Sequence, residues 1–209
     1  TLDRTTNGTG LVGDRTLAEL KQLDAGYRFS QDNGQTFPYR GKGITIPTLT
    51  EALNAVPDSL FLIELKEPLE LTEPAIKAIR EAKAERRLML ASANPLIMQQ
   101  VRKTAPEINT CYDPMNAAAL MAALRNGGWA EYKPTDTMIS FSPDLQVKFG
   151  VTDAEIRAIR AKGILVEIFT LNTADEMKQY LDVGVDSILT DRPDVLEQVL
   201  AERAKTQPK

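Results

Sequence analysis

Residues 61–66 read Phe61-Leu62-Ile63-Glu64-Leu65-Lys66, an apolar run with the composition of a buried strand. The run carries a carboxylate and an ammonium two positions apart, and such side chains point to the same side of a strand. Charges facing an interior are costly unless they are paired, bind a metal or lie at the solvent-open strand end, where active sites form. The stretch therefore predicts a buried strand and two site residues, Glu64 and Lys66.

Runs of this kind alternate with segments of helical period from Thr48 onward. Such alternation is typical of a parallel sheet with right-handed crossover connections. A closed (β/α)8 barrel needs eight strands, so the pattern falls two short. The six predicted strands are residues 60–65, 88–93, 108–112, 138–141, 165–169 and 187–190.

The intervening helices have recognisable starts and stops. Threonine followed three residues later by glutamate predicts a capping box, and a cap residue followed by proline also marks a first turn. Gly184 predicts the end of a helix that buries Met177, Tyr180 and Leu181. The starts are Thr16 with Glu19, Thr48 with Glu51, Thr152 with Glu155, Thr173 with Glu176, Thr72 with Pro74, and Asn94 with Pro95.

Residues 1–47 follow a different pattern. Residues 24–47 form a long, glycine-rich segment without a clear period, and loops of this length are usually functional or disordered. The aromatic residues Tyr27, Phe29, Phe37 and Tyr39 argue against disorder. We expect an ordered excursion near the mouth of a barrel, with residues 37–41 either covering the substrate or forming a packed turn.

Composition restricts the classes of function. The 209 residues can bury one sizeable core, so one domain is expected. A net charge of -4 without a basic stripe predicts no nucleic-acid partner, and no apolar run approaches the roughly 20 residues of a membrane span. The single cysteine, Cys111, cannot form an intrachain disulfide and leaves the cellular compartment open. The sequence contains no histidine, which is unusual for a hydrolase.

Five blocks resemble, in order and spacing, those of the glycerophosphodiester phosphodiesterase family. They cover essentially the whole chain, so the resemblance rests on their succession rather than on any one of them. The blocks are Leu2-Asp3-Arg4-Thr5-Thr6-Asn7-Gly8-Thr9-Gly10, Ile46-Pro47-Thr48-Leu49, Ile63-Glu64-Leu65-Lys66, Phe169-Thr170-Leu171-Asn172, and Gly184-Val185-Asp186-Ser187-Ile188-Leu189-Thr190-Asp191-Arg192-Pro193.

The resemblance implies a TIM (β/α)8 barrel with a small insertion after its second strand. Residues 1–47 would be that insertion, and residues 48–209 would hold the remaining six βα units. Residues 1–209 would then lack the first two strands of the barrel. The family's two catalytic histidines and two of its metal carboxylates belong to this missing part, so we expect no catalytic residue within residues 1–209 and little activity from them alone.

The resemblance also assigns site residues and chemistry. Glu64 would be one of three carboxylate ligands of a divalent cation, calcium or magnesium, and Lys66 would contact the phosphate. Phe169 stands where the family usually has tryptophan and would line the alcohol side of the pocket. The implied reaction is hydrolysis of a glycerophosphodiester to glycerol 3-phosphate and an alcohol, with lysophospholipids as a possible wider substrate class.

Several alternatives remain open on the residues alone. Glu64 and Lys66 could form a structural ion pair, Phe169 could simply pack, and Asn172 is better explained by hydrogen bonds that fix a loop. The whole chain could be an inactive barrel that serves as a binding module. Lys66 could instead form a Schiff base in an aldolase, which borohydride trapping would reveal. The sequence predicts no oligomeric state.

Overall fold

The computed structural model describes residues 1–206 and divides into two compact units, one of Thr1–Asp58 and one that starts at Ser59. Within the described chain, no helix combines the length and apolar character that a membrane span requires. The first unit contains 3-10 turns at Leu2–Arg4 and Val12–Asp14, and helices α1 (Leu17–Lys21) and α2 (Leu49–Ala55).

The second unit alternates strands and helices. Its strands are β1 (Phe61–Glu64), β2 (Leu88–Ala91), β3 (Asn109–Thr110), β4 (Met138–Phe141), β5 (Leu165–Ile168) and β6 (Ser187–Ile188). Its helices are α3 (Thr72–Glu81), α4 (Pro95–Thr104), α5 (Pro114–Arg125), α6 (Pro143–Phe149), α7 (Asp153–Ala161), α8 (Ala174–Val183) and α9 (Pro193–Thr206), with 3-10 turns at Leu69–Leu71 and Glu85–Arg87.

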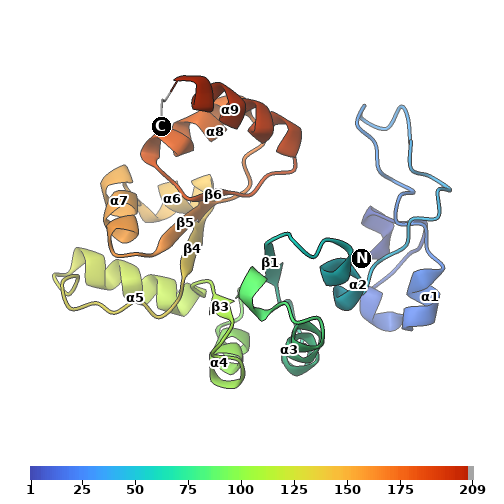
Figure 1. The fold of residues 1–209 in the computed structure, drawn as a ribbon, viewed down its shortest axis with the longest axis horizontal. Coiled ribbons are helices and arrows are strands. Elements are labelled where there is room, and N and C mark those ends of the chain that lie inside the picture. Colours follow the sequence, from blue (N-terminus) through green and yellow to red (C-terminus); the bar gives the residue numbers. More distant parts are fainter. Residues whose placement is uncertain (207–209) are drawn as a thin grey trace. The chain divides into compact units, whose positions relative to one another are not determined.

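All paired strands are parallel and follow the chain order, as β1-β2-β3 and β4-β5-β6 (Figure 1). A parallel bridge between Cys111 and Met138 joins the two sheets, and Thr137 N donates to Thr110 O at 2.8 Å beside it. All six predicted strands are confirmed, although most are shorter than predicted. The described residues do not close a barrel, because β1 and β6 each pair with one strand only.

The helix starts follow the local sequence closely. Threonine hydroxyls at positions 16, 48 and 152 accept from the backbone three residues on, and the glutamate at that position bonds back, which completes each capping box. Asn94 caps α4 ahead of Pro95, and Gly184 ends α8 with a positive φ of 98°. Thr173 accepts from Glu176 N as predicted, but its box lacks the reciprocal backbone bond.

The predicted cap at Thr72 is wrong. The 3-10 turn Leu69–Leu71 runs directly into α3, so Thr72 already has helical backbone angles of -60° and -50° and Leu71 is the cap residue. The Thr72 side chain is buried, and its hydroxyl has no hydrogen-bond partner in the described structure. A preceding turn of helix, which the cap-and-proline pattern does not reveal, moved the start of α3.

One face of the sheet in the second unit packs against helices. Leu90, Ile139 and Val166 on this face are at most 1% exposed. Side chains alternate between faces, so their neighbours in each strand point the other way. On that opposite face Leu62 is 37% and Leu165 40% exposed. The helix-covered face therefore carries the hydrophobic core, and the opposite face is available for polar groups.

The loop of the first unit is ordered by polar and aromatic contacts. The Asp24 carboxylate accepts from Gly26 N and Gly41 N, which ties the two ends of the loop together. The Arg40 guanidinium stacks on the rings of Tyr27 and Phe37 at 4.2 and 3.9 Å from their centroids. These contacts support an ordered loop, whereas its place near the mouth of a barrel and its lid function stay predictions.

Candidate active site

The structure brings Glu64 and Lys66 together. Lys66 Nζ donates to Glu64 Oε2 at 2.7 Å, and the two side chains keep 76% and 48% of their surface exposed, respectively. Glu64 is the last residue of β1 and lies on the opposite face from Ile63 and the buried Leu65. Carboxyl ends of parallel strands are where α/β proteins bind ligands, so the pair occupies the predicted place.

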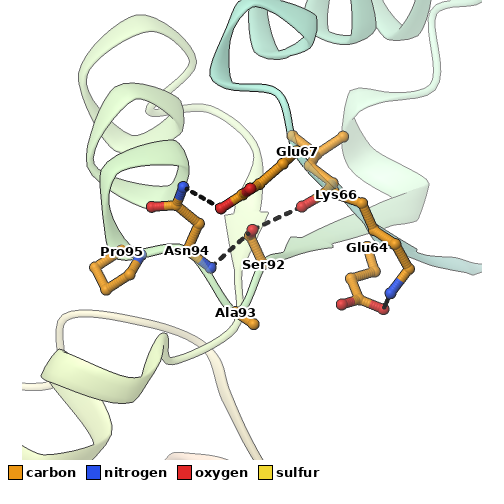
Figure 2. A pocket seen from close by; sticks show the side chains of 8 residues that line it. Glu64, Lys66, Glu67, Ser92, Ala93, Asn94 and Pro95 are labelled. Atoms are coloured by element: carbon orange, nitrogen blue, oxygen red, sulfur yellow. Dashed lines mark hydrogen bonds and ion pairs between the residues drawn. The ribbon is translucent and has the colours of Figure 1, made fainter. Parts of the chain in front are cut away.

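A pocket surrounds this pair at the carboxyl ends of β1 and β2 (Figure 2). Two short segments, residues 64–67 and residues 92–95, line it. In Figure 2 the Glu67 side chain points toward Asn94, whose Nδ2 donates to Glu67 Oε1 at 3.2 Å, and away from the pair of Glu64 and Lys66. The pocket thus presents two carboxylates and one ammonium to solvent.

Hydrogen bonds to the neighbouring strand fix the backbone between the charged residues. Leu65 N donates to Ala91 O at 2.7 Å, and Leu65 O accepts from the Ser92 hydroxyl at 2.6 Å. The same hydroxyl accepts from Asn94 N at 3.1 Å. Sequence analysis did not single out Ser92, Asn94 or Glu67 as site residues, because the strand pairing that brings segments 64–67 and 92–95 together is a long-range contact.

The pocket carries more acidic than basic groups, and Lys66 is the cationic group among its lining residues that can bind an anion. Lys66 is mostly exposed, and a mobile ammonium of this kind can turn from Glu64 to a phosphate. A divalent cation fits only in part. Glu64 offers a hard oxygen ligand of the type that calcium and magnesium prefer, but no group of three or more acidic, cysteine or histidine residues in the described chain could hold a metal ion.

Phe169 lies away from this pocket. It follows β5 directly, is half-buried, and its backbone N donates to Phe141 O at 2.9 Å. It does not line the pocket of Glu64 and Lys66. The role of Phe169 in binding the alcohol portion stays a prediction.

A second glutamate on a strand escaped sequence analysis. Glu167, in β5, is only 4% exposed and accepts from Ser140 Oγ at 3.1 Å and Ser187 Oγ at 2.9 Å. Each serine occupies the register position beside Glu167 on the neighbouring strand.

Burial, together with the negative charges of Glu167 and Asp136, raises the pKa of the Cys111 thiol to about 12. Cys111 is thus an inert thiol at neutral pH.

The interpretation of Asn172 as a loop-fixing residue is supported by its contacts. Asn172 Oδ1 accepts from Asp191 N at 2.9 Å and from the Thr190 hydroxyl at 3.2 Å. These bonds tie the segment after β5 to the segment after β6. Arg192 pairs with Asp194 at 2.7 Å at the start of α9.

Comparisons with known proteins point in one direction. A sequence profile of the glycerophosphoryl diester phosphodiesterase family matches residues 1–195. A glycerophosphodiester phosphodiesterase of Caldanaerobacter subterraneus subsp. tengcongensis is 32% identical over 209 residues, covering 94% of this chain and 75% of the relative.

Two solved structures are similar in fold. The glycerophosphodiester phosphodiesterase of Agrobacterium tumefaciens matches with a TM-score of 0.70 and 24% identity, over 96% of this chain and 78% of its own. A phosphodiesterase of Oleispira antarctica in complex with the product sn-glycerol-3-phosphate matches with a TM-score of 0.70 and 24% identity, over 96% of this chain and 76% of its own. The second unit therefore has a TIM-barrel-like α/β fold, and the chain belongs to the glycerophosphoryl diester phosphodiesterase family.

Proposed function

We propose that the protein hydrolyses glycerophosphodiesters to glycerol 3-phosphate and an alcohol, at a site built around Glu64 and Lys66. The observation that carries the proposal is the exposed ion pair of these residues in a pocket at the carboxyl ends of β1 and β2. Family membership supports phosphodiester hydrolysis over a Schiff-base aldolase. The product bound to the Oleispira antarctica relative supports glycerol 3-phosphate as the released group.

In this proposal Lys66 binds the phosphodiester. The substrate's phosphate competes with Glu64 for the ammonium, and the exposed pair separates at small cost because water screens it. As negative charge grows on the phosphoryl oxygens in the transition state, Lys66 offsets it. Phe169 packs against the alcohol portion when the mouth of the barrel is complete, because in a closed barrel β1 and β5 face each other across the interior.

The proposal includes a divalent cation, calcium or magnesium, with Glu64 as one of its ligands. Such a cation polarises a phosphodiester and stabilises its developing charge when bound. A single carboxylate cannot replace most of a cation's hydration shell, so further ligands are required. We place these ligands, and the general base and acid, on two barrel strands that the described residues do not contain.

The test is glycerol 3-phosphate release from glycerophosphocholine with added calcium or magnesium. We expect turnover by the full-length protein, and little turnover and weak cation binding by residues 1–209 expressed alone. Equal turnover by the two proteins would show that residues 1–209 already hold the complete catalytic site. No turnover by the full-length protein on glycerophosphodiesters or lysophospholipids would instead favour an inactive binding module.

A further inference from the structure

We propose that Ser92 is a positioning residue for the pair of Glu64 and Lys66, an inference that rests on the proposed function. Ser92 follows β2 and is 9% exposed. Its hydroxyl donates to Leu65 O at 2.6 Å, and Leu65 is the residue between the two charged side chains. Ser92 therefore contacts the backbone that both charged residues share, and Figure 2 draws this hydrogen bond as a dashed line from Ser92.

Leu65 is held on three sides. Its N–H bonds to Ala91 O at 2.7 Å, its carbonyl accepts from Ser92 and its side chain is buried. The ladder of β1 and β2 ends at Glu64 and Ala91 in register, so the bond from Ser92 continues the pairing where the regular strands stop. Fixing Leu65 aims Glu64 and Lys66 toward the same side, which is the condition for their joint action on one phosphate.

The Ser92 hydroxyl also accepts from Asn94 N at 3.1 Å, while Asn94 caps the start of α4 and bonds Glu67 through its side chain. One buried hydroxyl thus links the two segments that line the pocket. Without it, Leu65 O and Asn94 N would each lose a partner, and residues 64–67 would be free to adopt several conformations. Catalysis depends on such alignment, because small displacements of a charged group cost large factors in rate.

The experiment compares Ser92→Ala with Ser92→Thr in the full-length protein. We expect Ser92→Ala to lower kcat/KM for glycerophosphocholine by about 10-fold and to weaken binding of glycerol 3-phosphate by a few-fold, because misalignment of a charged group causes losses of this order. Ser92→Thr keeps the hydroxyl and should restore both values to near the wild-type level. Calorimetric titration with glycerol 3-phosphate supplies the binding readout independently of turnover.

Thr104→Val is the matched control. The Thr104 hydroxyl also donates to a backbone carbonyl, that of Gln100 at 2.8 Å, but it lies at the far end of α4. Its loss should lower thermal stability without changing kcat/KM. If Ser92→Ala does not fold, Ser92→Cys, which keeps the volume and weakens the donor, takes its place in the same comparison.

A double-mutant cycle separates positioning from a general structural role. If Ser92 aligns Lys66 with Glu64, Ser92→Ala should lower kcat/KM by a smaller factor when Lys66→Ala is already present than it does in the wild-type background. Three outcomes would overturn the inference. The loss could be equal in both backgrounds, Ser92→Ala could have wild-type kinetics, or Ser92→Thr could be as impaired as Ser92→Ala. Full turnover in Lys66→Ala itself would overturn the proposed site, whereas loss in Lys66→Ala with no effect of Ser92→Ala would overturn the positioning role alone.

Discussion

Glu64 and Glu167 occupy comparable local sequences but very different surroundings. Each follows two apolar residues in a parallel strand, and each stands two positions before a predicted site residue, Lys66 or Phe169. Glu64 is exposed and pairs with an ammonium, whereas Glu167 is buried and accepts from two serine hydroxyls. The contrast teaches that the partners of such a carboxylate decide its role: Glu64 pairs with Lys66 of its own segment and stays open to a ligand, whereas Glu167 is satisfied by both neighbouring strands and serves the fold.

The largest effect on activity is expected at the exposed pair of Glu64 and Lys66. Lys66→Ala should lower kcat/KM by about 100-fold, as expected for loss of a group that stabilises transition-state charge. Its effect on thermal unfolding should be small, because the ion pair is exposed. Steady-state kinetics and calorimetry check both statements, with Lys77→Ala on α3 as control. Normal turnover in Lys66→Ala would contradict the assignment of the exposed pair to the active site.

Substitution of the buried Glu167 should instead affect mainly the stability of the fold. Glu167→Ala removes the acceptor for Ser140 and Ser187 and leaves a cavity, so we expect it to lower the free energy of unfolding by about 2–3 kcal/mol. Glu197→Ala, at an exposed position of α9, should change it by less than about 0.5 kcal/mol. Urea unfolding measures the difference, and an unchanged midpoint in Glu167→Ala would show that this carboxylate does not stabilise the sheet.

A third glutamate extends the comparison to a helix start. The Arg125 guanidinium, which bonds both carboxylate oxygens, lowers the pKa of Glu155 to about 2 despite partial burial, and the Thr152 cap adds to the effect. A carboxyl with a lowered folded-state pKa stabilises above its unfolded pKa of about 4.3, and this contribution disappears as the pH falls toward 2.

Glu155→Gln should therefore cost about 1 kcal/mol at pH 7, the typical value of a cap. The gap in unfolding free energy between wild type and Glu155→Gln should narrow between pH 5 and pH 2. Urea unfolding across this range is the measurement. As a control, the free energy of unfolding of Glu197→Gln should change with pH in the same way as that of the wild type. A gap that stays constant down to pH 2 would contradict the assigned pKa shift.

Much of this fold could be predicted because its determinants are local. Periodicity located six strands, and the caps at Thr48, Thr152 and Asn94 depend on residues within one turn. The prediction that Thr72 is the cap residue was wrong because the 3-10 turn Leu69–Leu71 precedes it and makes Thr72 part of the helix. The site was predictable only where charge interrupted an apolar strand, at Glu64 and Lys66.

The partners of that site could not be predicted in the same way. Ser92 and Asn94 have ordinary helix-start chemistry in sequence, and their bonds to Leu65 and Glu67 arise from pairing between strands 27 residues apart. Glu167 was overlooked because its serine partners come from two other strands. The division at residues 58 and 59 places α2 with the first unit, while the single-domain barrel with an insertion at residues 1–47 stays a prediction.

The most direct test of the central claim is a calcium or magnesium titration of glycerophosphocholine hydrolysis by the full-length protein and its Glu64→Gln variant, with Glu70→Gln as an exposed control. The amide keeps the shape of Glu64 but weakens a cation ligand, so we expect Glu64→Gln to lose metal-dependent turnover by about 100-fold or more and to unfold like the wild type. Wild-type turnover and metal response in Glu64→Gln would contradict the account.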